Sequence, residues 1–388
     1  MAGYIFTLDS IDSLNELVKN GVYSTNLNVP LKNSWRAHHE GTFADYLSMS
    51  EGDNVYFFIS RKIYGVGKLI NINGDCKHLN FPGADIPVTE SFSKLKDKMI
   101  LNKSSFNLGN RFLCTFDNAP YFFQNGIDMD DVLASNPQAF KMLRVLWKLS
   151  FIKIDDNENK ALNDIILKSN ENEITIPKNV FSRSDKLHNR IQSIINKDYR
   201  VSTKNILALA ANKTIIGHEM AIEAGIIDYI KNNPNGIFGK WDYLSHQVVA
   251  SPFKPVDYMD KMDVFGYRFI PSFSTISKYL TIEIKKDIAD KEVINQLMKY
   301  VDWINQEYTF GDYSMIEAFV VAQDFPQEVI KLKKEAGQRS FVKGRRPAVT
   351  KHWESLRLIK YLFNENTKEL DFVEVGIYDS LEKKIHST

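Results

Sequence analysis

The chain has 388 residues, enough for two or three domains, since a domain usually takes about 100–200 residues. Its content of 44% hydrophobic and 25% charged residues is ordinary for a soluble globular protein. The two cysteines, Cys76 and Cys114, are too few for a disulfide framework or a cysteine zinc cluster, and they predict a reduced, cytoplasmic setting. No apolar run approaches the ~18 residues that a membrane span requires, so we expect no membrane association.

The net charge of +1 conceals an uneven distribution. Residues 331–360 hold ten Lys or Arg residues and two acids, a net charge of +8, so the rest of the chain carries −7. Clustered positive charge is typical of proteins that bind a phosphate backbone. A solvated basic helix face is the alternative. The first interpretation predicts that Lys343, Arg345 and Arg346 contact nucleic-acid phosphates.

The first 135 residues are rich in short β-like runs separated by turn residues such as Gly52-Asp53 and Asn73-Gly74. This pattern predicts a small, strongly curved sheet or barrel with a few helices. The clearest runs are residues 54–60 (NVYFFIS), 64–70 (YGVGKLI) and 111–116 (RFLCTF).

Residues 136 to about 214 are mostly helical in pattern. Phe140, Leu143, Leu146 and Trp147 fall at helical spacing, and polar, Asn-rich connections follow them. We expect a helical linker or a small helical domain here, and the sequence leaves both open.

From residue 215 onward the predicted elements follow in the order α-β-β-β-α-β, which buries a mixed sheet between helices. The first helix covers residues 218–232 and stops at Asn233-Pro234, because proline cannot continue a helix. The other elements are expected at residues 246–250, 262–270, 279–285, 291–305 and 315–322.

An acid and an amine share one face of the strand predicted at residues 279–285. Side chains alternate between the two faces of a strand, so Glu283 and Lys285 lie side by side. Ile282 and Ile284 point from the other face into a core. A surface strand with an exposed Glu–Lys pair is the alternative to a functional site.

Asp263 stands in the preceding β run, which can pair with this strand as a hairpin and bring two carboxylates together. Mg²⁺ binds through one or two carboxylates plus substrate phosphate, so we predict that Asp263 and Glu283 hold Mg²⁺ (or Mn²⁺). The metal would lower the pKa of a bound water, while Lys285 would orient that water or neutralise developing charge. Asp257 and Asp260 are alternatives for the aspartate.

Residues on the flanking helices complete a pattern. Glu223 stands eleven residues before Pro234, and Gln296 and Tyr300 lie four apart on one helix face. In chain order the pattern comprises Glu223, Asp263, Glu283 with Lys285, and Gln296 with Tyr300. It resembles the RecB-like PD-(D/E)XK nucleases, closest to the branch of mismatch-type and single-strand-junction endonucleases. The resemblance covers about 110 residues and implies that these side chains are catalytic.

Three details of this resemblance stay open. Glu219, one turn earlier, competes with Glu223 for the first-helix role. Gln247 is as consistent with a strand-end hydrogen-bonding residue as with an active-site residue. The interval from Asp263 to Glu283 is longer than the family leads us to expect, which predicts a long hairpin loop.

Three N-terminal stretches carry a second resemblance: Ser34-Trp35, residues 52–60 and residues 63–67. They resemble the PUA-like superfamily, and within it the EVE and YTH modules, small barrels that recognise modified bases flipped into an aromatic cage. Stacking contributes ~1–3 kcal/mol per base. The resemblance implies that Trp35 and Tyr64 form the cage and that Ser34 and Asp117 or Asn118 read the base edge.

Ordinary packing is the competing explanation for the N-terminal aromatics. Alternate aromatic side chains are core on any half-buried strand, and Phe57 or Phe58 is expected to pack in this way. Other enzyme motifs are absent: the sequence contains no H-E-x-x-H and no G-x-x-x-x-G-K-[ST].

The sequence therefore predicts a multidomain α/β and α+β protein. We expect three parts: a PUA-like barrel at 1–135, a helical segment at 136–214, and a restriction-endonuclease-like αβββαβ core with a basic extension at 215–388. Such a fusion resembles modification-dependent restriction enzymes, so we expect a Mg²⁺-dependent endonuclease of double-stranded DNA that carries a modified base. Cutting both strands needs two active sites, which predicts a homodimer. The alternatives are a mismatch- or structure-specific repair endonuclease and a non-catalytic reader of modified nucleic acid.

Overall fold

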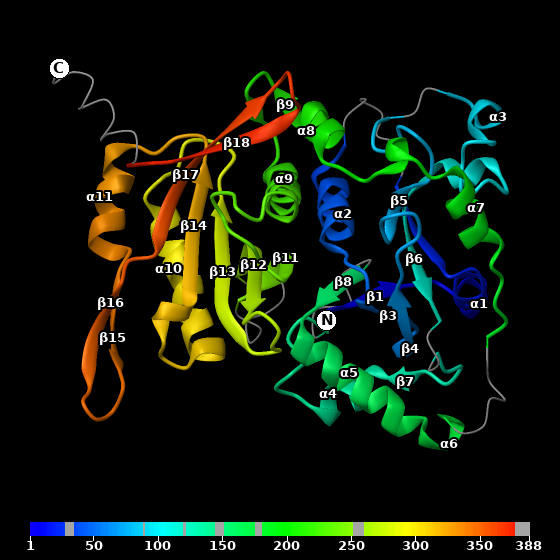
Figure 1. Ribbon diagram of the computed structural model, residues 1–388, viewed down its shortest axis with the longest axis horizontal. Helices are drawn as coiled ribbons and strands as arrows, with labels where there is room; N and C mark the ends of the chain where they lie inside the picture. Colours follow the sequence, from blue (N-terminus) through cyan, green and yellow to red (C-terminus); the bar gives the residue numbers. More distant parts are fainter. Residues whose placement is uncertain are drawn as a thin grey trace. The chain divides into compact units, whose positions relative to one another are not determined.

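The computed structural model describes residues 1–27, 35–87, 90–118, 122–143, 151–174, 181–250 and 260–376. The chain is a mixed α/β protein that divides into two compact units (Figure 1). Unit 1 comprises Met1–Trp35 and Asp45–Ser202, and unit 2 comprises Arg36–Ala44 and Thr203–Thr388. Within the described ranges, no helix has the length and apolar character that crossing a bilayer requires.

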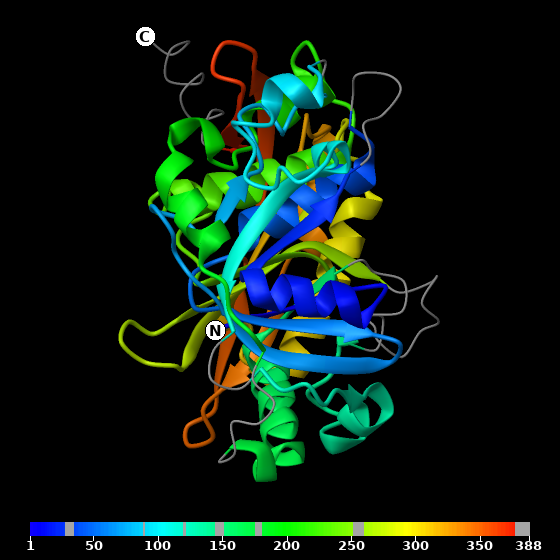
Figure 2. The same ribbon diagram turned by 90° about the vertical axis from the view of Figure 1, so that its right-hand side faces the viewer.

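Unit 1 is built on an eight-stranded mixed sheet with the order β2-β6-β4-β3-β1-β8, in which β5 also pairs with β6 and β7 with β4. Its strands curve strongly (Figure 2). β1 and β3 are parallel, whereas the other pairs are antiparallel. The three predicted β runs correspond to β3, β4 and β6. The strands are β1 (Gly3–Thr7), β2 (Val22–Asn26), β3 (Asn54–Ile59), β4 (Lys62–Leu69), β5 (Lys77–Leu79), β6 (Asn110–Asp117), β7 (Ile127–Asp128) and β8 (Phe151–Ile154).

Helix α1 of unit 1 begins at a polar cap and ends at a glycine. In α1 the Ser10 side chain accepts a hydrogen bond from the Ser13 amide, and Gly21, with φ of 61°, ends the helix by donating to the Leu17 carbonyl. Helix α2 (Ala37–Ser48) begins in unit 2 and ends in unit 1. The others are α1 (Ile11–Asn20), α3 (Phe92–Leu95), α4 (Met129–Ser135), α5 (Asp156–Ser169), α6 (Glu171–Ile174) and α7 (Lys186–Ile194).

Aromatic side chains form much of the unit 1 core. Phe57, which the strand pattern placed in the core, is fully buried. Its ring centroid lies 5.7–5.8 Å from those of Phe6, Phe116 and Phe122. The explanation of ordinary packing is therefore confirmed for this residue, while the PUA-like barrel as a whole stays a prediction.

The middle of the chain contributes to unit 1 up to Ser202. β8 pairs antiparallel with β1, so this segment extends the sheet. The helix expected around residues 140–147 falls mostly on residues 144–150, which lie outside the described part, so it stays a prediction. Just before them, the buried Glu158 carboxyl accepts hydrogen bonds from the backbone amides of Met142 and Leu143, at 2.8 and 3.3 Å.

Unit 2 contains a six-stranded sheet with the order β11-β12-β13-β14-β17-β18. The first three strands are antiparallel neighbours, β14 is parallel to both β13 and β17, and β18 is antiparallel to β17. The predicted α-β-β-β-α-β order is present as α9 (Glu219–Asn232), β11 (Tyr243–Val249), β12 (Lys261–Phe269), β13 (Ile276–Ile284), α10 (Glu292–Ile304) and β14 (Ile316–Ala322).

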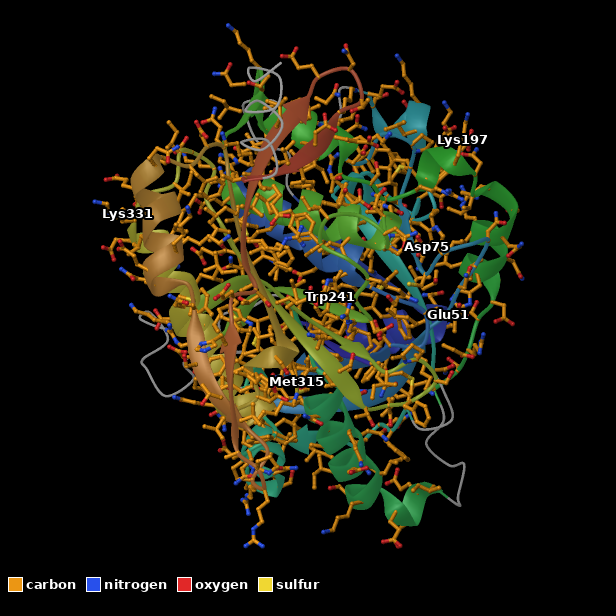
Figure 3. All side chains as sticks on the ribbon, turned by 60° about the vertical axis from the view of Figure 1, so that its left-hand side comes forward. Glu51, Asp75, Lys197, Trp241, Met315 and Lys331 are labelled. Atoms are coloured by element: carbon orange, nitrogen blue, oxygen red, sulfur yellow. The ribbon has the colours of Figure 1, made fainter. Side chains whose placement is uncertain are left out.

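Further elements of unit 2 precede and follow this core in the chain. They are α8 (Lys204–Ala210), β9 (Ala211–Asn212), β10 (Ile215–Ile216), α11 (Gln327–Ala336), β15 (Arg339–Lys343), β16 (Val349–Trp353), β17 (Leu356–Asn364) and β18 (Glu369–Glu374). Lys331 extends from the outer side of α11 (Figure 3) and pairs with Glu335 one turn later. β15 and β16 form a separate two-stranded sheet.

Strand β13 is covered on both faces. Tyr279 to Ile284 are all buried, because α9 packs on β11, β12 and β13 while α10 packs on β13 and β14. The apolar stripe of α10 that the sequence predicted (Val293, Leu297, Val301 and Ile304) is fully buried. A charged side chain in the second half of β13 is therefore taken out of water.

The β12–β13 hairpin corrects one expectation. The interval between Asp263 and Glu283 is occupied by two nine-residue strands joined over residues 270–275. The predicted long hairpin loop is wrong, because the strands themselves are long.

Candidate active site

The register of β11, β12 and β13 places Gln247, Asp263 and Glu283 in one row across the sheet. Asp263 is fixed at two points: Oδ2 accepts a hydrogen bond from the backbone amide of Ile284 (2.7 Å), and Oδ1 accepts one from Gln247 Nε2 (3.2 Å). The hairpin thus brings together the two carboxylates that the sequence predicted to hold a metal.

Helix α9 supplies a third acid to this row. Glu223 is only 1% exposed, and its Oε1 accepts a hydrogen bond of 2.8 Å from Gln247 Nε2. The Gln247 amide therefore joins Glu223 to Asp263. His246 Nδ1 lies 3.1 Å from the other Glu223 oxygen. Sequence reasoning missed His246; the signal was a polar His-Gln pair inside an otherwise apolar strand.

The backbone at Gln247 is unusual for a residue inside a strand. Its φ of 52° lies in the left-handed region, which non-glycine residues rarely adopt. Strain of this kind costs roughly 1–3 kcal/mol and persists only where surrounding contacts hold it. Here the two carboxylate contacts of the Gln247 amide are such restraints.

Glu283 and Lys285 form the pair that strand alternation predicted. Lys285 Nζ lies 2.8 Å from Glu283 Oε1, and the lysine side chain is 30% exposed. Glu283 Oε2 is buried and has no hydrogen-bond partner in the described part of the chain. Buried polar atoms in proteins are normally satisfied, so this free oxygen marks a position for an absent partner.

Burial and mutual repulsion disfavour the charged form of the acids in the row. Burial raises the pKa of Asp263 well above its ordinary value, and the charges of Glu283 and Glu223 add to the rise. Burial likewise raises the pKa of Glu283 to about 7, against the lowering effect of Lys285 and with further raising by Glu219 and Glu223. Burial by itself would lower the pKa of Lys285, but Glu283 raises it above the usual value.

This donor set fits a hard divalent cation. It offers two adjacent carboxyl groups, one free buried oxygen, and acids whose ionisation a bound cation would favour. In the described ranges, no three or more acidic, His or Cys side chains are arranged to hold a metal by themselves. A cation here would therefore be held by Asp263 and Glu283 and completed by water and a substrate phosphate, as Mg²⁺ usually is.

Gln296 and Tyr300 of α10 border the same row. Gln296 Nε2 donates a hydrogen bond of 3.0 Å to Tyr300 Oη, as their i, i+4 spacing suggested. Burial raises the pKa of Tyr300, and the charges of Glu283, Asp263 and Asp260 raise it further.

The residues that competed for these roles also have definite positions. Glu219 accepts a hydrogen bond of 3.3 Å from the Lys286 amide, so α9 brings both Glu219 and Glu223 to the site. Asp260 and Tyr300 are among the residues that line a neighbouring cavity of about 260 Å³. Asp257 lies outside the described residues. The hydrogen bonds of Asp263 place it, rather than Asp260, beside Glu283.

The base-reading residues predicted in unit 1 do not form one cluster, unlike the acids of unit 2. Trp35 is only 2% exposed; its Nε1 donates to the Asp85 carbonyl (2.7 Å), and the Arg111 guanidinium lies 5.1 Å from its ring centroid. Tyr64 is buried, and Asp117 forms an ion pair with Arg183. These contacts are separate from one another.

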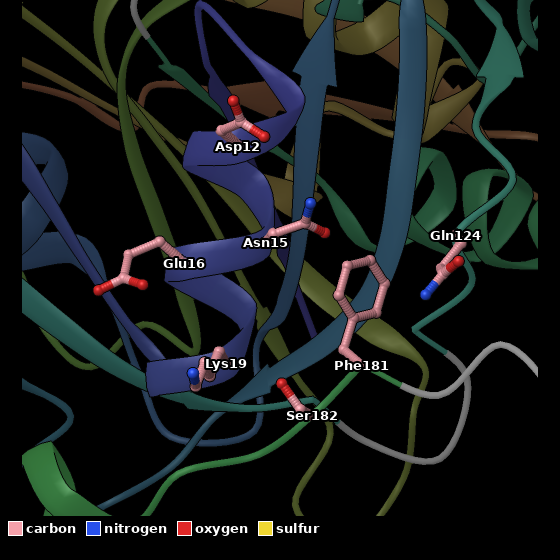
Figure 4. A pocket seen from close by; sticks show the side chains of 7 residues that line it. All are labelled: Asp12, Asn15, Glu16, Lys19, Gln124, Phe181 and Ser182. Atoms are coloured by element: carbon pink, nitrogen blue, oxygen red, sulfur yellow. The ribbon is translucent and has the colours of Figure 1, made fainter.

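The remaining two predicted reader residues are Ser34 and Asn118. Ser34 lies outside the described residues, and Asn118 follows the end of β6. Unit 1 has a polar cavity of about 360 Å³ (Figure 4) that Trp35, Tyr64 and Asp117 do not line. It is lined by Asp12, Asn15, Glu16, Lys19, Gln124, Phe181 and Ser182. The aromatic cage stays a prediction.

The predicted DNA-binding residues cluster at the β15–β16 hairpin. Lys343 Nζ lies 3.1 Å from Asp312 Oδ2, at the end of β15. Arg345 and Arg346 are exposed in the connection between the two strands. The hairpin thus concentrates part of the basic segment in one protruding element.

Comparison with known proteins gives limited information. No family model matches the chain, and no curated protein matches it. Among solved structures, a repair endonuclease from Pyrococcus abyssi (24% identity, TM-score 0.21), an EndoMS–dsDNA2 complex (21%, 0.22) and EndoMS in its apo form (18%, 0.21) each align with 30% of this chain. The aligned part spans only 41–43% of those chains. At these TM-scores the alignments do not define the fold of this chain.

Proposed function

We propose that unit 2 is a metal-dependent endonuclease that hydrolyses phosphodiester bonds in DNA. The observation that carries the proposal is the position of Asp263 and Glu283 one residue beyond the Val264–Ile282 pair of the hairpin, with Lys285 on Glu283 Oε1 and the buried Glu283 Oε2 free. A structural ion pair would not require the additional buried acid Glu223 or a free carboxylate oxygen.

Each residue of the row has a definite task in such a reaction. Asp263 and Glu283 would hold the cation, which when bound lowers the pKa of a water and neutralises charge on the phosphate. Lys285, which is 30% exposed, would contact a phosphate oxygen or hold the attacking water. Glu223 restrains Asp263 through the Gln247 amide, so it sets the position of a carboxylate.

For the substrate, we propose double-stranded DNA that carries a modified base, read by unit 1, with a homodimer cutting both strands. The support is the basic segment of unit 2 and the resemblance of the N-terminal stretches to modified-base readers. A mismatch- or structure-specific repair endonuclease is the second candidate. The full burial of Trp35 beneath Arg111 favours it, because a cage must be open to accept a base.

A cleavage panel tests these proposals. Unmodified, cytosine-modified, adenine-modified and mismatched duplexes are incubated with the full chain, with Mg²⁺ and with a chelator. Metal-dependent cutting of modified duplexes alone supports the restriction role, and cutting of mismatched duplexes alone supports repair. If wild-type protein binds modified duplexes but cuts no substrate in the panel, it is a non-catalytic reader.

Substitutions assign the reaction to the row. Glu283→Gln and Asp263→Asn should each reduce cleavage at least about 100-fold, as when one electrostatic contact to a transition state is removed. The matched control is Glu317→Gln on β14 of the same sheet, where the carboxylate pairs with Arg268 at 3.3 Å. Unchanged cutting by Glu283→Gln would contradict the site assignment.

A further inference from the structure

The hairpin formed by β15 and β16, here called the ribbon (residues 339–353), is anchored firmly at its base. Trp353 is buried and its Nε1 donates to the Ile316 carbonyl (2.8 Å), while Phe341 is buried on the facing strand. The Arg339 guanidinium contacts both Asp302 oxygens, at 2.9 and 2.8 Å. The base of the ribbon is therefore part of unit 2.

Beyond this base the ribbon has no covering. Residues 342–352 are all exposed, although Val342 still pairs with Thr350 and Lys343 with Val349. Figure 1 shows the ribbon projecting from the rest of unit 2, at the lower left. Two-stranded hairpins are only marginally stable in water by themselves, and Val342 is 65% exposed. The feature is an ordered surface without a partner in the described part of the chain.

The two faces of the ribbon differ in chemistry. Cross-strand register places Ser340 opposite His352 and Val342 opposite Thr350, so these four side chains share one face. Hydroxyl groups can hydrogen-bond to base edges, and apolar methyl groups contact the methyl of thymine. This face contains no Lys, Arg, Asp or Glu and offers the groups that read bases.

The rest of the ribbon is basic. Residues 339–353 contain five Lys or Arg residues and no acid. Arg339 and Lys343 pair with Asp302 and Asp312. The other three, Arg345, Arg346 and Lys351, have no ion pair with any residue in the described ranges. Three exposed and uncompensated cations beside an uncharged face complement a polyanion.

We propose that the ribbon enters the major groove of duplex DNA. This groove is ~12 Å wide and admits a two-stranded β-ribbon, with phosphates on either side for the basic residues. The major groove of duplex RNA is too narrow for side chains to read, so B-form DNA is the partner. The inference rests on the proposed function only in taking DNA as the substrate.

The attachment point predicts where the contact falls. Trp353 contacts Ile316 at the start of β14, whereas Glu283 pairs with Val320, four residues further on. The ribbon points against the direction of β14 (Figure 1). At ~3.3 Å per residue, Val342, which pairs with Thr350 three residues before Trp353, lies roughly 23 Å from Glu283. That distance corresponds to about seven base pairs at ~3.4 Å each.

Binding of the full chain to a fluorescent 30-base-pair duplex, in a chelator and at several salt concentrations, tests the proposal. The ribbon variant carries Arg345→Gln, Arg346→Gln and Lys351→Gln. It should weaken binding and reduce the slope of log K against log salt by ~0.9 per lost phosphate contact, or about 2.7 in total. The matched control, Lys213→Gln, Lys240→Gln and Lys368→Gln, removes three exposed charges elsewhere in unit 2 and should keep the wild-type slope.

Two further measurements define the mode of contact. A photo-crosslinking amino acid at position 342 should label DNA about seven base pairs from the cut, and the ribbon variant should bind duplex RNA as wild type does. A wild-type salt slope in the ribbon variant, equal losses on DNA and RNA, or no DNA binding by wild type would overturn the proposal. If the ribbon variant binds DNA as wild type does and wild type cleaves normally, only the proposed role of the ribbon is refuted. If DNA binding depends on the ribbon but wild type does not cleave, only the proposed nuclease function is refuted.

Discussion

At Gln247 the backbone and the side chain make opposite demands. A φ of 52° is unfavourable for any residue except glycine, yet the amide that joins Glu223 to Asp263 requires a side chain. The position therefore retains a strained residue for the sake of two hydrogen bonds to acids. We expect Gln247 to set how the carboxylates receive a cation.

Two substitutions separate these demands. Gln247→Ala removes the amide and keeps the strain, whereas Gln247→Gly removes both. Both variants should need about tenfold more Mg²⁺ for half-maximal cleavage. This is the lower end of the loss of metal affinity that is usual when a residue that orients metal ligands is removed. The glycine variant should be more stable than the alanine variant by ~1–2 kcal/mol in chemical denaturation. Equal metal dependence in all three proteins would show that the amide has no part in cation binding.

Among individual residues, the acids of the row could be found from sequence because strand alternation and helix spacing are local rules. Glu283 beside Lys285, and Gln296 beside Tyr300, follow directly from periods of two and of three to four residues. The polar His246-Gln247 pair is visible in the sequence, but the contact of His246 with Glu223 could not be found, because it depends on how α9 packs across β11. Packing also hid the burial of Trp35, whose neighbour Arg111 is far away in the chain.

At the scale of elements, α1 depends on a glycine that no other residue can replace. Gly21 has φ of 61°, and a Cβ there would lie 2.5 Å from the Phe116 carbonyl oxygen. Gly21→Ala should therefore destabilise unit 1 by roughly 2–4 kcal/mol, from left-handed strain and overpacking together. Thermal or urea unfolding would measure the loss.

The matched control for this substitution is Gly52→Ala. Gly52 also has a positive φ, of 87°, but an added Cβ would meet only Met1 Sδ at 4.0 Å. Gly52→Ala should therefore lower the free energy of unfolding only by the cost of the left-handed backbone conformation, ~1–2 kcal/mol. If both variants lose a similar amount of stability, the close approach of Gly21 to β6 contributes nothing to the cost of the Gly21→Ala substitution.

The elements of unit 2 were predictable because each is bounded by a local signal, such as the stop at Asn233-Pro234. Contacts between distant residues could not be predicted in this way. The amides of Met142 and Leu143 are bound by Glu158, a residue about one helix length further along the chain. Local periodicity carries no information about such a partner.

At the scale of the whole molecule, Glu158 links stability to pH. Burial raises its pKa from 4.5 to about 8, and the neighbouring Asp155 carboxyl adds to the rise. Between these pH values the native state keeps a proton that the unfolded chain releases. Its contribution to the free energy of unfolding is therefore lost progressively as pH rises from about 4.5 to 8.

Glu158→Gln should flatten this pH dependence. The amide oxygen can still accept from the Met142 and Leu143 amides, but the side chain cannot ionise. We expect the variant to gain stability relative to wild type at pH 8 and to gain little at pH 5. Urea denaturation at both pH values measures the difference. A constant difference between the two proteins across this range would contradict the assignment.

The division of helix α2 has a consequence for how the protein can be dissected. Residues 36–44 belong to unit 2, where the Glu40 oxygens lie 3.0 Å from His218 Nδ1 and a Cβ on Gly41 would lie 3.4 Å from Met220 Sδ. In the linear chain, unit 1 therefore interrupts unit 2. During translation, the first piece of unit 2 leaves the ribosome more than 150 residues ahead of the rest. A recombinant C-terminal half that starts at Thr203 would lack this piece, so a gene fragment for unit 2 has to rejoin residues 36–44 to it.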